Sequence, residues 1–144
     1  METCIFCQII SKKSEAYIIY EDDLMCCFLD KFPINTGHVL VVPKKHYPEF
    51  RDVDTLSLHA IMEIAQKVTI ALEDILDTDG ITVMQNNGMF KDVEHYHMHI
   101  IPRFQNDGFS WNEPNVMVAS NTFSSLKDVL QGYLLKSSAE KGPS

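Results

Sequence analysis

The sequence predicts an α+β fold in which an antiparallel sheet of five strands packs against one long helix. Three β-rich runs come first, a stretch with helical periodicity follows, and two further β-rich runs come after it. The strands are expected at 16–20, 24–29, 38–42, 81–85 and 95–101, and the helix at 54–77. Strands grouped before and after a single long helix, instead of alternating with helices, are typical of α+β proteins.

The first third of the chain is expected to supply a short helix and three strands. Residues 4–10 predict the helix, and the acidic turn at 21–23 joins the first two strands as a hairpin. A loop that contains Pro, Asn and Gly follows at 30–37. The next strand, 38–42, is entirely aliphatic after its first residue, which is typical of a strand buried on both faces.

The long helix is predicted by apolar residues spaced three and four apart. They are Leu58, Ile61, Ala65, Val68, Leu72 and Ile75. At about 1.5 Å per residue the helix is roughly 36 Å long, enough to cover one face of a small sheet. Asp54 is the expected N-cap and Gly80 the expected stop. His59 lies beside the apolar stripe and is expected at the surface.

The chain beyond the last strand has a different composition. An irregular stretch rich in Asn, Asp, Gly and Pro precedes a possible last amphipathic helix at 124–135. Residues 137–144 are expected to form a disordered tail. We expect a single domain at 1–136, with its core at 4–104 and a C-terminal extension at 105–136.

Composition excludes several classes of partner. The 144 residues carry a formal net charge of −8, from 12 basic and 20 acidic side chains. This balance argues against general nucleic-acid binding, which needs a basic surface. No apolar run approaches the roughly 20 residues that span a bilayer, and no signal peptide is evident. We therefore expect a soluble, cytoplasmic protein with no nucleic-acid or membrane partner.

Three histidines alternate with apolar residues along the last predicted strand. Because side chains two apart on a strand share a face, His95, His97 and His99 should point one way and Tyr96 and Met98 the other. Imidazole serves as a zinc ligand, as a nucleophile and as a proton carrier near neutral pH. The row could therefore be a metal site, a nucleophilic centre or simply a polar strand face.

The four cysteines fall into two pairs. Cys4 and Cys7 form a C-x-x-C motif, which in a cytoplasmic chain indicates metal or redox chemistry more than a structural disulfide. Cys26 and Cys27 are adjacent in an apolar run and are expected to pack on opposite faces of a strand.

The histidine row and a second block resemble the histidine triad (HIT) nucleotide-binding family. The segment 95–101 is similar to the His-φ-His-φ-His-φ-φ signature, where φ is apolar, and 37–46 is similar to the family's other block. The resemblance covers roughly residues 4–104. It implies a HIT-like fold with a five-stranded antiparallel sheet, one long helix and short terminal helices, and a homodimer in which the sheets join.

The same resemblance implies a nucleotide hydrolase. His97 would attack the α-phosphorus of a nucleoside phosphoramidate or a dinucleoside polyphosphate and expel the leaving group, and water would then hydrolyse the nucleotidyl-histidine. His99 and His38 match family positions that supply stabilising contacts to the phosphoryl oxygens. The substrate would be a purine nucleotide, AMP- or GMP-linked. Two alternatives stay open: a non-catalytic nucleotide-binding or signalling protein, and a nucleotidyltransferase, against which Met98 argues because related transferases have Pro there.

Other implied positions concern nucleotide binding. Phe28 matches an apolar residue packed on the base, Asp30 matches the carboxylate that accepts bonds from the ribose, and Asn86 precedes the phosphate-contacting loop. Lys91 stands where Gln is usual, and Asp92 where a hydroxyl residue is usual. His97 and His99 complete this set. A lysine can bind phosphate, whereas an aspartate repels it, so Asp92 calls the leaving-group specificity into question. The family also suggests that Trp111 lies near the site.

The family further implies a structural zinc ion. Cys4, Cys7, His46 and His95 match the four ligand positions of bacterial-type members, and Cys₂His₂ is a common closed zinc set. The alternative is a metal-free, reduced pair of cysteines that packs the N-terminal helix. No organic cofactor is expected.

Overall fold

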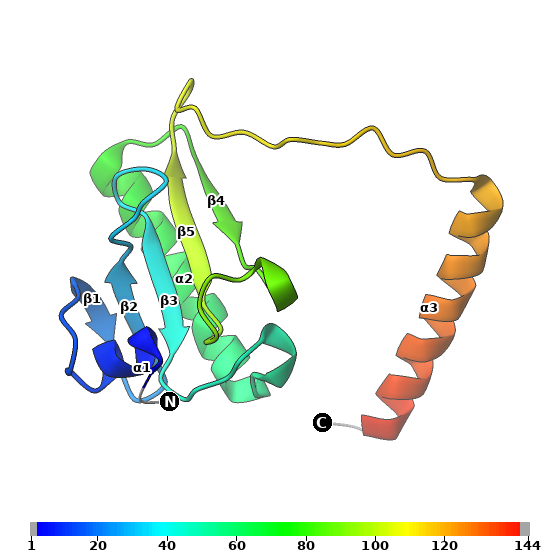
Figure 1. The fold of residues 1–144 in the computed structure, drawn as a ribbon, viewed down its shortest axis with the longest axis horizontal. Helices are drawn as coiled ribbons and strands as arrows, with labels where there is room; N and C mark the ends of the chain where they lie inside the picture. The colour runs from blue at the N-terminus through cyan, green and yellow to red at the C-terminus, as the bar shows by residue number, and fades with distance from the viewer. Residues whose placement is uncertain (1–2, 142–144) are drawn as a thin grey trace. The chain divides into compact units, whose positions relative to one another are not determined.

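The computed structural model describes residues 3–141 and contains one five-stranded sheet (Figure 1). The strands lie in the order β1-β2-β3-β5-β4, and all neighbouring pairs are antiparallel. The strands are β1 (Ile18–Glu21), β2 (Met25–Leu29), β3 (Val39–Pro43), β4 (Gly80–Met84) and β5 (Met98–Arg103). The α-helices are α1 (Ile5–Ile10), α2 (Thr55–Leu76) and α3 (Ser120–Lys141), with 3-10 turns at Phe50–Asp52 and Gly88–Phe90. The predicted α+β class and five-stranded sheet are confirmed.

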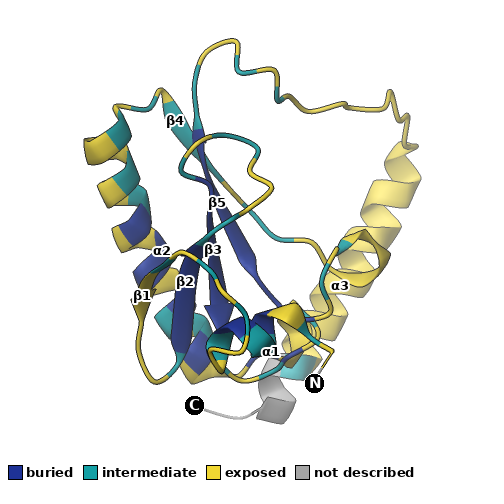
Figure 2. Cartoon of the chain, turned by 60° about the vertical axis from the view of Figure 1, so that its left-hand side comes forward, coloured by how far each residue is buried: buried dark blue, intermediate teal, exposed yellow. Residues whose placement is uncertain are grey.

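The central strand β3 is buried along its whole length, as predicted (Figure 2). One face of the sheet packs on α2, and the other face packs on α1 through Phe6 and Ile9. Cys26 belongs to the α1 side and Cys27 to the α2 side, so the two adjacent thiols pack on opposite faces. The sheet therefore separates two apolar cores, and α1 lies on the face of the candidate site.

Helix α2 begins where the sequence predicts, because the Asp54 carboxylate accepts a hydrogen bond of 2.8 Å from the Ser57 backbone amide. Its end differs. The helix stops at Asp77, which takes a left-handed conformation (φ +51°), and Gly80 begins β4 instead of ending the helix. The prediction that Ile75 faces the core is also wrong, since it is 77% exposed. Leu76 faces inward in its place.

The predicted strand at 95–101 is shorter than its alternating pattern indicates. Strand β5 begins only at Met98, which pairs with Val41, so His95 and His97 lie in the extended segment before the strand. The ladder stops because the chain diverges here: the Tyr96 amide donates to the Tyr47 carbonyl instead of to β3. The segment remains extended enough for all three histidines to be buried.

The C-terminal part is a second compact unit, Ser110–Ser144, distinct from Met1–Phe109. The prediction of a single domain at 1–136, with its core at 4–104 and a C-terminal extension at 105–136, stays a prediction. Helix α3 begins before the predicted 124–135 and runs through 137–141, because these positions are occupied by helix-forming and polar residues with no proline. The prediction of a disordered tail at 137–144 stays a prediction; 137–141 lie in α3, and 142–144 lie outside the described residues. Among the helices described, none is both long and apolar enough to cross a membrane.

Gly37 fixes the loop that leads into β3. Its φ is +91°, and a Cβ there would lie 2.6 Å from Leu76 Cδ1 and 3.2 Å from Pro102 Cγ. The close approach allows the loop to pack between the end of α2 and β5. The next residue, His38, then points to the face of the sheet opposite α2.

We predict that Gly37→Ala lowers the free energy of unfolding by about 2–4 kcal/mol, because left-handed strain and overpacking add. Urea unfolding measures the change. Gly108→Ala is the matched control: Gly108 also has a positive φ (+80°), but a Cβ there meets nothing within 4 Å. It should cost only about 1–2 kcal/mol. Equal losses in the two variants would show that the close approach to Leu76 contributes nothing.

Candidate active site and metal centre

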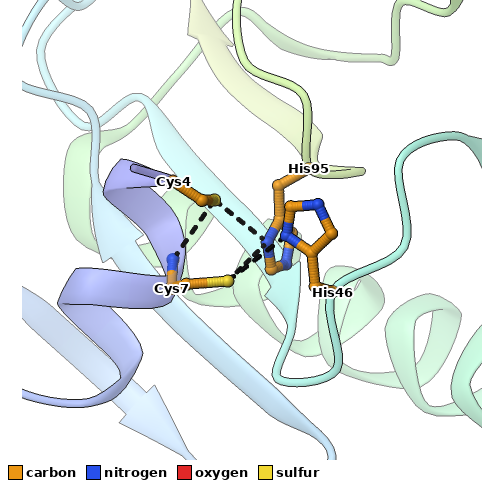
Figure 3. Close-up of side chains that lie close together, drawn as sticks. All are labelled: Cys4, Cys7, His46 and His95. Atoms are coloured by element: carbon orange, nitrogen blue, oxygen red, sulfur yellow. Dashed lines mark hydrogen bonds between the residues drawn. The ribbon is translucent and has the colours of Figure 1, made fainter. Parts of the chain in front are cut away.

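Two thiols and two imidazoles converge beside the start of α1 (Figure 3). Cys4 caps α1, Cys7 lies in its first turn, His46 follows β3, and His95 precedes β5. Cys7 Sγ lies 3.3 Å from His46 Nδ1 and 3.6 Å from His95 Nδ1, and Cys4 Sγ lies 3.5 Å from His95 Nδ1. The four ligand atoms all lie within 4.8 Å of one another. The structure thus assembles the four residues that sequence spacing alone could not join.

The separations fit a tetrahedral metal ion. With metal–sulfur bonds of about 2.3 Å and metal–nitrogen bonds of about 2.0–2.1 Å, neighbouring S and N ligands lie roughly 3.5 Å apart. His95 Nε2 donates to the Pro43 carbonyl at 2.8 Å, which leaves the Nδ1 lone pair directed at the thiols. Burial lowers the pKa of His95 to about 4 and raises the pKa of the Cys7 thiol to about 11. The imidazole is therefore ready to bind a cation, which must displace the thiol proton.

His97 lies next to this cluster with one ring nitrogen fixed by the backbone. Its Nδ1 lies 2.7 Å from the His95 carbonyl oxygen, which can only accept, so Nδ1 carries a proton. The side chain is buried, and the Phe6 ring packs edge-on at 5.0 Å between centroids. Nε2 faces the carboxylate of Asp92, with Oδ1 at 3.2 Å. Because a carboxylate only accepts, Nε2 donates to Asp92 when it too carries a proton; when the ring is neutral and Asp92 has moved away, the backbone contact at Nδ1 leaves Nε2 as the nitrogen with the lone pair.

A chain of hydrogen bonds sets the tautomers of the other two histidines. The Ile34 amide donates to His38 Nδ1 at 3.0 Å, so the His38 proton is on Nε2 and is donated to His99 Nδ1 at 2.9 Å. His99 therefore carries its own proton on Nε2, a buried atom for which no partner is found among the described residues. Burial lowers the pKa of His99 to about 4 and also lowers that of His38. His99 is therefore a neutral ring whose Nε2–H can donate a hydrogen bond to a ligand.

His38 is held in place by the loop on its N-terminal side. The Asn35 carboxamide donates to the Pro102 carbonyl and to Asp107 Oδ2, both at 2.8 Å. The Arg103 guanidinium beside Asp107 holds the pKa of that carboxyl well below its usual range, so the anchor keeps its charge. The loop before β3 is thus tied to the turn after β5, and His38 cannot move away from His99.

His97 and His99 line a cavity of about 170 Å³ beneath α1. The apolar part of its wall comes from α1, β2, β3 and the segment before His95, and the polar part is Asp30, Asp92, His97 and His99 among others. The apolar residues include Ile5, Phe6, Ile9, Phe28, Leu40 and Val93. An apolar slot that ends in ionisable groups suits a flat ring attached to a charged group.

The structure brings most of the predicted site residues together, but not all. Phe28 and Asp30 line the cavity, and Asp30 Oδ2 lies 3.5 Å from His38 Nε2. Asn86 and Lys91 do not line it. The Lys91 ammonium lies 2.8 Å from Glu49 Oε1 and 3.4 Å from Glu94 Oε2. Their contact with a nucleotide stays a prediction. Trp111 belongs to the other compact unit, so its proximity to the site also stays a prediction.

Three functional groups were not found by sequence reasoning. They are the Phe6 ring against His97, the Ile34 amide that fixes His38, and the Pro43 carbonyl that fixes His95. Two of these are backbone groups, which any residue type would supply, so the sequence holds no signal for them. Phe6 sits between the two cysteines, and its position on the inner face of α1 was the only available signal.

The chain resembles known proteins in both sequence and structure. A model of the HIT domain matches residues 11–106. The chain belongs to the HIT family. An uncharacterised HIT-like protein of Borreliella burgdorferi is 39% identical over 119 residues, which cover 80% of this chain and 86% of the relative. An adenosine 5′-monophosphoramidase of Schizosaccharomyces pombe is 35% identical over 103 residues, covering 70% and 74%.

A solved HIT structure offers a comparison for the metal centre. The zinc-bound histidine triad family protein from Mycobacterium smegmatis superposes with a TM-score of 0.72 at 31% identity, over 80% of this chain and 85% of that chain. The fold predicted from the two motifs is therefore that of the HIT family. The cluster of two thiols and two imidazoles in this HIT protein is compatible with the same metal.

The depressed pKa of His99 predicts acid sensitivity of the fold. Below pH 6.5 the unfolded chain takes up a proton that the folded chain accepts only near pH 4, so stability is lost as pH falls through this window. The slope contributed by His99 should approach about 1.4 kcal/mol per pH unit. Urea unfolding from pH 7 to pH 4.5 should show a shallower decline in His99→Gln than in the native protein. Parallel declines would contradict this assignment.

Proposed function

We propose that this protein is a nucleotide hydrolase that cleaves at the α-phosphate of a purine nucleoside phosphoramidate through a nucleotidyl-histidine intermediate. The observation that carries the proposal is the His97 ring, whose Nδ1 proton is held by the His95 carbonyl while Nε2 faces the cavity. The phosphoramidase activity of the yeast relative supports the choice of substrate class. Dinucleoside polyphosphates are the second substrate class compatible with this chemistry.

The first step forms the covalent intermediate. The Nε2 lone pair of His97 attacks the α-phosphorus, and the bond from phosphorus to the leaving nitrogen breaks. That nitrogen is protonated from solvent, so its electron pair departs on a neutral amine. The Nδ1–H of His97 remains bound to the His95 carbonyl, which stabilises the positive charge that develops on the ring. The His99 N–H donates to the phosphoryl oxygens, where negative charge accumulates.

The second step releases the nucleotide. Water attacks phosphorus, the Nε2–phosphorus bond breaks, and its electron pair returns to Nε2. The water proton goes to solvent, and the neutral ring with its proton on Nδ1 is restored. His38 supports both steps as a positioning residue, because it fixes the His99 tautomer without facing the phosphate itself.

The cavity would bind the nucleoside of the substrate. A purine ring would pack on Phe28 and the apolar residues of α1, and the Asp30 carboxylate would accept hydrogen bonds from ribose hydroxyls. Asp30 Oδ1 already accepts the Phe32 amide at 2.9 Å, which orients Oδ2 toward the cavity side where His38 lies. The side chain of Asp30 is only 17% exposed, so its position is well defined.

A homodimer completes the proposal. Strand β4 is an edge strand of the sheet, and an unpaired edge favours pairing with a second chain. The outer side of α2 exposes Leu56, Met62 and Ile70, each more than half exposed. Joining β4 to a second β4 and covering these side chains would extend the sheet and bury the apolar surface.

One observation favours a second candidate, a nucleotide-binding protein without hydrolytic activity. Asp92 Oδ1 occupies the approach to His97 Nε2, at 3.2 Å. If the carboxylate never withdraws, the nucleotide binds and the attack does not occur. The adduct experiment below separates the two functions.

We further propose that Cys4, Cys7, His46 and His95 hold a structural zinc ion. The donor set and its spacing fit zinc, and a zinc-bound relative supports the choice. When bound, the ion supplies a closed tetrahedral crosslink between α1 and the segments that follow β3 and precede β5. Reduced thiolates of this kind suit the cytoplasm.

We predict one zinc per native chain and none in Cys7→Ser. Native mass spectrometry of protein purified without chelator measures the stoichiometry, and thermal unfolding should show a lower midpoint for the variant because the crosslink is lost. Cys26→Ala is the matched control, since that thiol is buried outside the cluster and should keep its zinc. Native protein that purifies without zinc and does not gain stability from added zinc contradicts the assignment.

We predict that native protein mixed with adenosine 5′-phosphoramidate forms an adenylyl adduct and releases AMP, whereas His97→Ala does neither. Intact mass spectrometry after an early acid-free quench detects the adduct. His59→Ala, which removes an exposed imidazole on α2, should behave as the native protein does. Nucleotide binding with no adduct and no AMP in the native protein would support the binding-protein function instead.

A further inference from the structure

Asp92 places a negative charge at the mouth of the cavity, next to the proposed nucleophile. Its Oδ1 lies 3.2 Å from His97 Nε2, and it lines the same cavity as His99. The side chain is 78% exposed, in contrast to the 4% of His97. The carboxylate therefore sits on the solvent side of the ring and can withdraw when a phosphate enters.

The loop that carries Asp92 is fixed from the other side by Glu49. Glu49 Oε1 accepts the Gly88 amide at 2.9 Å and the Lys91 ammonium at 2.8 Å. Lys91 also pairs with Glu94 at 3.4 Å. The neighbouring lysine thus has two carboxylate partners of its own, and its charge is directed at Glu49 and Glu94 instead of at Asp92. The Asp92 carboxylate contacts His97 Nε2 instead of the lysine, so a phosphate that displaces it from the ring leaves its charge free to act on a group at the cavity mouth.

In the proposed function the leaving group would occupy that mouth. The nucleoside would fill the apolar part of the cavity, which α1 and Phe28 line, and the α-phosphate would lie at His97 and His99. What is attached to the phosphate on its other side must then extend toward solvent, past Asp92. A carboxylate there attracts a cation, repels an anion and is nearly indifferent to a neutral group.

We propose that Asp92 is the specificity-determining residue for the leaving group. It selects amines that carry a second, positively charged group besides the nitrogen bonded to phosphorus, such as a diamine or a lysine-like amine. Phosphate and sulfate leaving groups, which are anionic, are disfavoured. This inference rests on the proposed function and deepens it, because it separates phosphoramidates from dinucleoside polyphosphates as substrates. Since Asp92 is exposed, salt weakens the preference.

Three AMP phosphoramidates that differ only at the far end of the leaving amine test the proposal. Their amines are 1,2-diaminoethane, ethanolamine and glycine, which present an ammonium, a hydroxyl and a carboxylate. For the native protein we expect kcat/KM to be about tenfold higher for the ammonium than for the carboxylate at low salt, with a smaller ratio at high salt. In Asp92→Asn the ratio should fall to within about twofold of one.

Glu94→Gln is the matched control. It removes one negative charge from the same loop, from a side chain that is 79% exposed and pairs with Lys91 instead of facing His97. It should keep the native ratio. A second measurement needs no turnover: binding of the three compounds to His97→Ala, by calorimetry, should follow the same order, and the order should vanish in His97→Ala/Asp92→Asn.

The outcomes are distinct. If native protein hydrolyses all three compounds equally, or if Asp92→Asn accelerates all three by the same factor, Asp92 does not select the leaving group and the proposal is overturned while the hydrolase function stands. If Glu94→Gln loses the ratio as well, the net acidity of the chain is responsible, and the proposal is again overturned. If native protein forms no adduct with any compound, the proposed function fails and this inference fails with it.

Discussion

The backbone and side chain of one residue, His95, join the two centres of this protein. Its ring offers Nδ1 to the two thiols while Nε2 is held by the Pro43 carbonyl, and its own carbonyl holds the His97 proton at 2.7 Å. The cluster of Cys4, Cys7, His46 and His95 and the ring of His97 are therefore linked through this one residue.

Strand β3 supports this arrangement, because a residue at each of its ends orients a histidine. At one end of β3, Pro43 orients His95, and at the other end His38 orients His99. The loop before β3 is anchored twice: Gly37 allows it to pack against Leu76, and Asn35 ties it to Pro102. A strand buried on both faces is a rigid support for two tautomer-setting contacts.

Much of the fold and part of the site could be predicted from the sequence, for physical reasons that differ between elements. Periodicity located all five strands and α2, because alternating and helical patterns report which face is buried. It misjudged Ile75, because Leu76 follows Leu72 by four residues and approaches Gly37 beside it, and it overextended β5, since the alternation continues where the ladder has stopped. Contacts between remote segments were accessible only through the family resemblance.

The remaining contacts depend on loops whose conformation no pattern encodes. The approach of Asp92 to His97 requires Glu49, a residue far away in sequence, to hold the loop at 88–94. The amide of Ile34 and the carbonyl of Pro43 act through the backbone, so their residue types carry no signal. Helix α3 and its exposed apolar side chains form a separate unit, which composition alone did not distinguish from an extension of the domain.

The central claim is that the His95 carbonyl fixes the His97 proton on Nδ1 and so makes Nε2 the attacking atom. Nitrogen NMR of protein labelled with ¹⁵N-histidine, trapped as the adenylylated intermediate, tests it most directly. The account predicts a phosphorus–nitrogen coupling on Nε2 of His97 and a bound proton on Nδ1. Phosphorus attached to Nδ1, or to another histidine, would contradict it.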